Sequence, residues 1–226
     1  MTVWARISET VSGLTDSVSH LIGLGHAVDA PPEKSMAFTI GMIALGAKMA
    51  KADGVVTEDE VKAFSEVFHV PKKDQPAVER VFNLAKQDVA GFESYASQVA
   101  KLFTLKSSVL ESVLDGLFHI AKADGIVHEN ELLYLESVAE IFGFGNVDFA
   151  RIRARHVSLN DDPYDILGIE PGMSFAEIKK HYRSLVRELH PDKQIAAGVP
   201  AEMVKIATER LSKINDAYGA LEKELA

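Results

Sequence analysis

The chain contains no cysteine, and this absence excludes several kinds of chemistry at once. Disulfide bonds, thiol nucleophiles and cysteine-ligated zinc sites all require a thiol group. A chain without disulfides is compatible with a reducing compartment, where structural disulfides do not persist. We therefore expect neither a disulfide-stabilised scaffold nor a thiol enzyme.

Long apolar segments are scarce as well. A transmembrane helix needs about 20 mainly apolar residues, whereas the most apolar run, residues 36–47, is shorter and is followed by Lys48 and Lys51. The N-terminus also lacks the basic start, apolar centre and small-residue cleavage site of a signal peptide. We expect a cytoplasmic protein, with peripheral binding to the inner membrane as the alternative.

Basic residues are outnumbered by acidic ones. The 226 residues include 24 Lys and Arg against 33 Asp and Glu, which gives a net charge of −9. Proteins that bind nucleic acid carry a basic footprint, so this balance argues against nucleic acid as a partner. The chain also has no glycine-rich phosphate-binding loop of the Walker type. We predict a protein that is not an enzyme and that uses no cofactor.

What the sequence does contain is helical periodicity throughout, without the sustained alternation that indicates a sheet. Within residues 1–30, apolar residues recur at steps of three and four and form the stripe Val3, Ile7, Val11, Leu14, Val18 and Leu21. We predict an amphipathic helix that packs on the body of the protein or on a second copy, as a homodimer. An interfacial membrane helix is the less favoured alternative, because the polar face has almost no Lys or Arg.

Residues 31–157 are predicted to form a bundle of helices. The candidate helices cover residues 34–52, 57–68, 73–88, 91–105, 107–123, 129–142 and 146–155. An internal repeat lies within the bundle: "MAKADGVVTEDEVKAF" begins at Met49 and "IAKADGIVHENELLYL" at Ile120, an offset of 71 residues (120 minus 49). Two similar helix-loop-helix units are expected to cover each other's apolar faces.

The loops of this repeat imitate the second half of a calcium-binding EF-hand loop. Aligned in that way, Asp53 and Asp124 take the fifth loop position. The third position is then Lys51 or Lys122, and a lysine repels a cation that needs oxygen ligands. We therefore predict no metal site in these loops.

The same loop residues have a structural role that needs no metal. Gly54 and Gly125 are predicted to end one helix in a left-handed cap. Thr57 and Glu60 are predicted to form a capping box for the next helix. Acidic residues in such positions, Glu131 included, are expected to be solvated groups at helix starts.

The twin "KADG" loops between apolar helices resemble the TerB-like domain, a family named from tellurite-resistance proteins. The resemblance covers residues 33–157. Some members of the family have been linked to metal binding through acidic residues, so the resemblance keeps metal binding as an alternative for this part of the chain.

A second helical unit is expected over residues 161–226, after the short polar linker "VSLNDDP" at residues 157–163. Ser174 and Glu177 form a capping box for a helix over residues 175–189. The apolar face of this helix consists of Ile178, Tyr182, Leu185 and Leu189. A second face is basic and consists of Lys179, Lys180, Arg183 and Arg187. In an acidic chain this face is a local reversal of charge.

The tripeptide His190, Pro191 and Asp192 follows this helix. Pro191 must stop the helix, and the polar loop "DKQIAAGVP" then leads to a last helix over residues 201–224, so that the tripeptide lies at the tip of an antiparallel hairpin. One His and one Asp provide no nucleophile and too few ligands for a metal. Taken alone, the tripeptide is only a helix stop with two exposed polar residues.

The combined pattern "DPYDILGI", "IKKHYRSL", "HPDK" and "INDAYGAL" resembles the J-domain, over residues 161–226. Joined to a TerB-like domain, it makes the whole chain resemble the DjlA-type J-domain proteins. J-domains stimulate ATP hydrolysis by chaperone ATPases of the DnaK class. The resemblance implies that the chaperone is bound by His190, Pro191 and Asp192 together with Lys179, Lys180, Tyr182, Arg183 and Arg187.

We therefore expect an all-α co-chaperone that binds a DnaK-class chaperone through its J-domain. The TerB-like domain is expected to be an adaptor or a module that binds clients. The alternative is a stress-response scaffold of the tellurite or envelope type, in which the TerB-like domain binds a metal or an envelope component.

Overall fold

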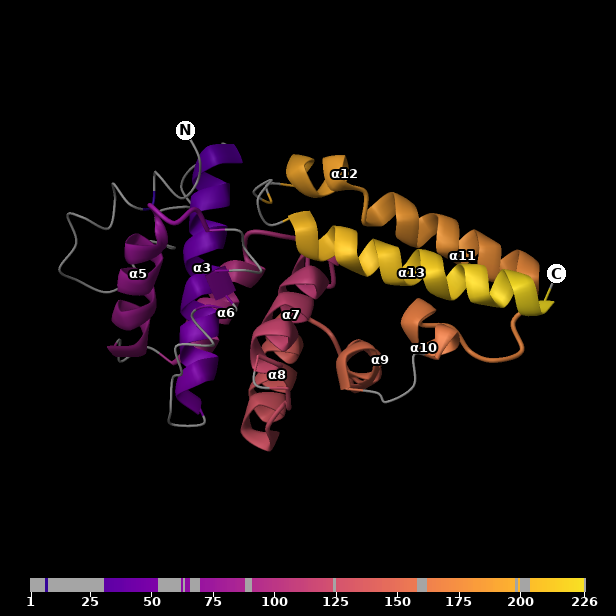
Figure 1. The fold of residues 1–226 in the computed structure, drawn as a ribbon, viewed down its shortest axis with the longest axis horizontal. Coiled ribbons are helices and arrows are strands. Elements are labelled where there is room, and N and C mark those ends of the chain that lie inside the picture. Colours follow the sequence, from indigo (N-terminus) through magenta and orange to yellow (C-terminus); the bar gives the residue numbers. More distant parts are fainter. Residues whose placement is uncertain are drawn as a thin grey trace.

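The computed structural model describes Ile7 and residues 31–52, 62, 64–65, 70–87, 91–123, 125–157, 162–197, 199 and 204–225. The described residues form helices, turns and loops and contain no strand, which confirms the all-α prediction (Figure 1). The helices are α3 (Pro31–Ala52), α5 (Gln75–Gln87), α6 (Phe92–Ala100), α7 (Ser108–Ala121), α8 (Glu129–Ile141), α9 (Asn146–Val157), α10 (Pro163–Leu167), α11 (Phe175–Glu188), α12 (Pro191–Ala196) and α13 (Val204–Leu225). None of the described helices is long and apolar enough to cross a membrane.

Helices α3 to α9 form an N-terminal bundle around α3 (Figure 1). Residues 37–47 of α3 are all buried, as expected of a helix that is apolar on every side. Helix α8 is tied to it by Tyr134, whose hydroxyl donates a 2.8 Å hydrogen bond to the carbonyl of Leu45. Ile7 is helical and fully buried in the same core, so the predicted N-terminal stripe meets the body of the protein at that position. The other stripe residues lie outside the described residues.

The second copy of the repeat differs from its prediction in two details. Helix α7 ends at Ala121 with Lys122 as its C-cap, so Gly125 is not the cap of that helix; its φ of 95° belongs to the following turn. Lys122 donates a 2.6 Å hydrogen bond to the carbonyl of His156 at the end of α9. Glu131 accepts a 2.8 Å hydrogen bond from the backbone of His128, but it is buried rather than solvated. In the first copy, Asp53, Gly54, Thr57 and Glu60 lie outside the described residues.

Helices α10 to α13 form a C-terminal unit, in which α11 and α13 run antiparallel (Figure 1). The predicted capping box is present: the backbone of Ser174 donates to Glu177 at 2.9 Å, and the backbone of Glu177 donates to the Ser174 hydroxyl. The apolar face of α11 packs against α13, with Ile178 and Leu189 buried as predicted. Gly168 has the left-handed conformation that ends α10, with φ 67°.

The stretch after the tripeptide is not the loop that the sequence predicts. Pro191 ends the preceding helix as expected, but it is also the first residue of the short helix α12. His190 is the N-cap of α12, because its Nδ1 accepts a 3.2 Å hydrogen bond from the backbone of Asp192. The prediction weighed proline only as a helix stop, although its fixed φ also suits the first position of a helix.

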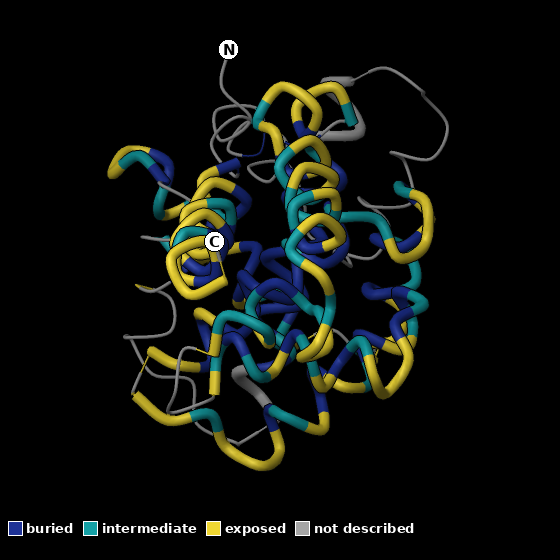
Figure 2. The backbone as a smooth tube through the Cα atoms, turned by 90° about the vertical axis from the view of Figure 1, so that its right-hand side faces the viewer, coloured by how far each residue is buried: buried dark blue, intermediate teal, exposed yellow. Residues whose placement is uncertain are grey.

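The two units share an interface rather than a flexible joint. Val199 and Val204, which precede and begin α13, are buried in the core of the N-terminal bundle. Figure 1 shows this end of α13 lying across α7, while the rest of α13 pairs with α11. Figure 2 shows that the sides of the helices facing the middle of the molecule are buried and that the outer turns are exposed. The described part of the chain therefore has two apolar clusters joined at α7, α12 and the start of α13.

Candidate functional site

The basic face of α11 is open to solvent. Lys180, Arg183 and Arg187 are exposed, and Lys179 is half-buried with its ammonium 6.0 Å from the centre of the Phe175 ring. No salt bridge within the described residues joins any of the four cations to a carboxylate. Unpaired exposed cations on one helix face create a positive field that can attract an acidic surface.

Tyr182 lies differently from the four cations. Its ring stacks on that of Tyr218 in α13, with centroids 4.0 Å apart, and its hydroxyl donates a 3.1 Å hydrogen bond to Asn215. Tyr182 is half-buried between α11 and α13, so its first role is to hold these two helices together.

The tripeptide forms a compact exposed turn at the end of α11. The Asp192 side chain is 89% exposed and that of His190 56% exposed, so both can meet another molecule. His190 Nδ1 lies 3.8 Å from Asp192 Oδ2 and accepts the backbone N–H of Asp192. Because Nδ1 is an acceptor, the neutral ring carries its proton on Nε2. Within the described residues the Asp192 carboxylate forms no salt bridge with a lysine or arginine, so it is free to meet a partner.

The turn is anchored from beneath by Gln194. This side chain is 2% exposed, and its Nε2 donates to the Ser108 hydroxyl at 3.0 Å and to the carbonyl of Glu188 at 3.1 Å. Ser108 is the first residue of α7, and its hydroxyl also donates to the Glu188 carbonyl at 3.4 Å. The start of α7 therefore meets the end of α11, an arrangement in which the two helix dipoles attract each other.

A buried charged cluster joins α7, α9 and α13 below this anchor. Glu111 and Asp115 lie on α7, Arg155 on α9 and Arg210 on α13, and each of the four is less than a tenth exposed. Arg155 Nη2 lies 2.8 Å from Glu111 Oε1 and 3.2 Å from Asp115 Oδ1. Arg210 Nη2 lies 2.7 Å from Glu111 Oε1, and its Nη1 lies 3.7 Å from Asp115 Oδ2.

Two further side chains complete the cluster. Arg151 Nη2 is 3.7 Å from Glu111 Oε1. His156 Nε2 is 2.7 Å from Asp115 Oδ1, and its ring stacks on Phe118 with centroids 4.7 Å apart. Three guanidinium groups thus surround two carboxylates in a region that little water can reach.

The pKa values of the cluster follow from burial and from these neighbours. Burial alone would raise the pKa of Glu111, but Arg210 and Arg155 outweigh it and hold that pKa below its usual value. The pKa of Asp115 is likewise lowered, because Arg155, a hydrogen bond from His156 and Arg210 together outweigh burial. Burial lowers the pKa of His156, so the ring is neutral at pH 7 and donates to Asp115.

The sequence prediction missed this cluster, although a signal for it exists. Helix α7 is apolar on almost every side, so Glu111 and Asp115 have no face on which to meet water. Buried carboxylates need cationic partners, and Arg151 and Arg155, four residues apart, are candidates in α9. Nothing in the local sequence points to Arg210, which lies 99 residues beyond Glu111 (210 minus 111).

The described residues contain no group of three or more His, Asp or Glu side chains arranged to hold a metal ion. The carboxylates of the charged cluster are already engaged by arginines. Asp53, Glu60 and Asp124, which belong to the repeat loops, lie outside the described residues.

These features define a class of protein. A capped basic helix, an exposed His-Pro-Asp turn and a stacked antiparallel partner helix make up the C-terminal unit, and the family model of the DnaJ domain matches residues 162–225. The family model "Tellurite resistance protein TerB" matches residues 39–154, within the N-terminal bundle. The chain belongs to the TerB family through this bundle and carries a DnaJ domain, the J-domain, after it.

Curated proteins named as co-chaperones are similar to this one along most of the chain. The Co-chaperone protein DjlA of Photobacterium profundum is 26% identical over 219 residues, which cover 85% of this chain and 79% of the relative. The Co-chaperone protein DjlA of Coxiella burnetii is 29% identical over 197 residues, 77% of this chain and 73% of the relative. That of Escherichia coli K12 is 24% identical over 203 residues, 78% of this chain and 75% of the relative. No solved structure matches the chain.

Proposed function

We propose that this protein is a co-chaperone whose J-domain binds a DnaK-class chaperone and stimulates its ATP hydrolysis. The observation that carries the proposal is the exposed carboxylate of Asp192, held in a short turn directly after a basic helix face that has no carboxylate partner among the described residues. The protein itself acts without catalysis, because the ATP and the catalytic groups belong to the chaperone.

The physical mechanism has two parts. Lys179, Lys180, Arg183 and Arg187 attract an acidic surface of the chaperone and set the orientation of the encounter. The turn at His190 and Asp192 then presents one carboxylate in a fixed place, because Pro191 and the His190 cap restrict the backbone around it. Tyr182 contributes by holding α11 on α13.

The test is single-turnover ATP hydrolysis by a DnaK-class chaperone at increasing concentrations of the full chain. Asp192→Asn is expected to abolish stimulation while the melting temperature stays within about one degree, because exposed substitutions usually change stability by about 0.5 kcal/mol or less. Asp216→Asn, an exposed aspartate on α13, is the matched control and should stimulate as the parent does. Full stimulation by Asp192→Asn would refute the proposal.

We further propose that the TerB domain is an adaptor that binds a client or a second partner. The support is that the relatives named as co-chaperones share both domains over about three quarters of their length. Proteins captured through the TerB domain should be retained equally by the parent and by Asp192→Asn, since only the chaperone depends on Asp192. Loss of every captured protein with Asp192→Asn would contradict the adaptor role.

A further inference from the structure

One face of helix α7 contacts the J-domain at two separate places. Ser108, Glu111 and Asp115 are spaced at i, i+3 and i+7, which places them along one side of the helix. Ser108 meets α12 and the end of α11, whereas Glu111 and Asp115 meet Arg210 of α13. A single helix of the TerB domain therefore touches three helices of the J-domain.

The first contact, at Ser108, lies next to the His-Pro-Asp turn. Gln194 is only two residues beyond Asp192, and its amide joins Ser108 to the last carbonyl of α11. Both ends of the turn, Glu188 on one side and Gln194 on the other, are thus held by one hydroxyl of the TerB domain. The side chains of His190 and Asp192 remain exposed beside this contact.

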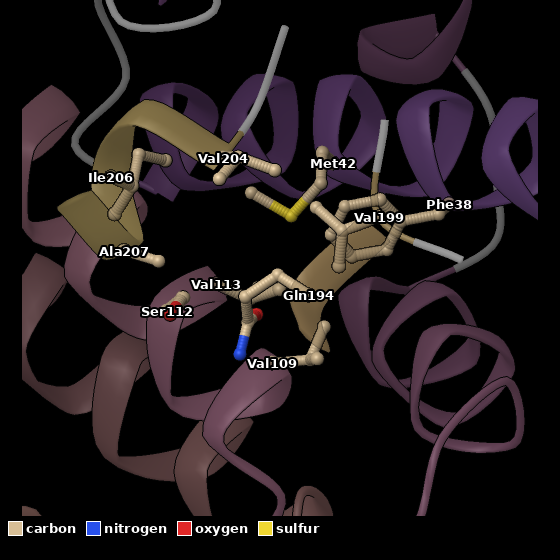
Figure 3. A pocket seen from close by; sticks show the side chains of 10 residues that line it. All are labelled: Phe38, Met42, Val109, Ser112, Val113, Gln194, Val199, Val204, Ile206 and Ala207. Carbon is tan, nitrogen blue, oxygen red and sulfur yellow. The ribbon is translucent and has the colours of Figure 1, made fainter. Parts of the chain in front are cut away.

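The second contact, at Glu111 and Asp115, holds α13 against α7. Arg210 is buried against Glu111 at 2.7 Å, and the apolar residues around this junction come from both domains. Figure 3 shows Val199 and Val204 of the J-domain beside Phe38 and Met42 of α3, with Val109 and Val113 of α7 below. These residues surround a cavity of about 10 Å³, room for about one water molecule, so the two domains pack closely at this junction.

A buried charge contact joins the two domains beside this junction. Burial and Arg155 lower the pKa of Arg210, although its guanidinium remains protonated. Within the TerB domain, Asp115 and Glu111 outweigh burial and raise the pKa of Arg155. Arg210 therefore needs Glu111 and Asp115, its carboxylate partners in the other domain, to offset its burial.

We propose that the face of α7 formed by Ser108, Glu111 and Asp115 is a positioning surface for the chaperone-binding turn, so that the TerB domain sets how strongly the J-domain stimulates its ATPase. Ser108 and Gln194 are positioning residues, since neither reaches the exposed side of the turn. Arg210 maintains the same contact from α13. The inference rests on the function proposed above and adds a regulatory contact to it. A partner that changed how α13 packs on α7 would change the stimulation of ATP hydrolysis without binding the basic face of α11.

The first test compares matched variants in the single-turnover assay. Ser108→Ala and Gln194→Ala should each lower the maximal stimulated rate by at least about five-fold, because each removes two hydrogen bonds of the anchor. The concentration that gives half of the maximal rate should change by less than about two-fold, because the basic face is intact. Ser137→Ala and Gln98→Ala make the same replacements at helix positions remote from α12 and should match the parent.

Rescue and distance measurements separate positioning from general damage to the fold. Ser108→Thr keeps the hydroxyl and should restore most of the rate. The cysteine-free chain allows spin labels at Glu136→Cys in α8 and Ala220→Cys in α13, both exposed positions. The distance distribution between the labels should broaden in Arg210→Met and stay narrow in Arg153→Met, an exposed arginine of α9.

Three outcomes would overturn the inference. Ser108→Ala and Gln194→Ala could both stimulate at the parental maximal rate; the rate could fall without recovery in Ser108→Thr; or the loss could be shared by Ser137→Ala and Gln98→Ala. If the parent stimulates and Asp192→Asn does not, such a result removes only the role of α7. If the parent itself fails to stimulate, the proposed function fails and this inference fails with it.

Discussion

The protein has two groups of arginines with opposite environments. Arg183 and Arg187 stand on the exposed face of α11 without a carboxylate partner among the described residues, whereas Arg155 and Arg210 are buried between two carboxylates. Exposed charges steer encounters and are screened by salt. Buried charges cost free energy unless each is paired, and once paired they hold their helices in one arrangement. The first group can meet a partner, and the second holds the two domains together.

The same contrast between a buried and an exposed charge holds for Asp115 and Asp192. Replacing each of them by asparagine tests this contrast. Asp115→Asn should lower the free energy of unfolding by about 3 kcal/mol, because it leaves Arg155 and Arg210 buried with one carboxylate fewer. Asp192→Asn should change it by about 0.5 kcal/mol or less. Chemical denaturation of both variants measures the difference. Equal losses at the two sites would show that the cluster contributes no more to stability than the exposed turn.

Acid should destabilise the fold through the buried group. Folding lowers the pKa values of Glu111 and Asp115. The two carboxylates therefore stabilise the folded state at neutral pH, and this contribution is lost as the pH falls below their ordinary pKa values of 4.5 and 3.8. Burial also lowers the pKa of His156, so the unfolded chain takes up a proton first, and stability begins to fall below about pH 6.5.

The denaturation midpoint of the parent should therefore decrease between pH 7.5 and pH 5, and by less in His156→Gln, which keeps a donor for Asp115. His119→Gln, an exposed histidine on α7, provides the control and should behave as the parent. A parent midpoint that stays constant over this interval would contradict the role of His156.

Variants of the exposed face should have a smaller effect that depends on salt. Lys179→Ala and Arg183→Ala should each raise the concentration of half-maximal ATPase stimulation by a few-fold at low ionic strength. The difference should shrink in physiological salt, where charges are screened beyond about 8 Å. Lys101→Ala, at an exposed lysine that caps the end of α6, serves as the control. Effects that are independent of salt would indicate that these residues act through direct contacts instead of steering.

The smallest expected effect is that of calcium on the repeat loops. If the loop lysines exclude a cation, millimolar calcium should leave the melting temperature unchanged. A site saturated at 100 times its dissociation constant would add about 2.7 kcal/mol to the free energy of unfolding, which a thermal shift would reveal. A clear upward shift in calcium would restore the metal-binding alternative for the TerB domain.

Local patterns in the sequence predicted the individual helices well, because each pattern acts over one or two turns. The Ser174–Glu177 capping box and the apolar face of α11 lie where the spacing predicts. The errors also arise locally. The patterns predict Pro191 only as the end of a helix and Gly125 only as a helix cap, whereas Pro191 also begins α12 and Gly125 lies in a turn. In each case the residue suits two backbone positions, and only the neighbouring hydrogen bonds select between them.

The sequence by itself determined the all-α fold, the basic face of α11 and the exposed turn at His190 and Asp192, since periodicity, capping and proline act along a single segment. Tertiary structure alone decided that Ser108 meets Gln194 and that Arg210 meets Glu111. These pairs are separated by 86 and 99 residues along the chain. They come together only when α7, α12 and α13 pack, because burial on α7 leaves its polar groups no partner except the helices that cover it.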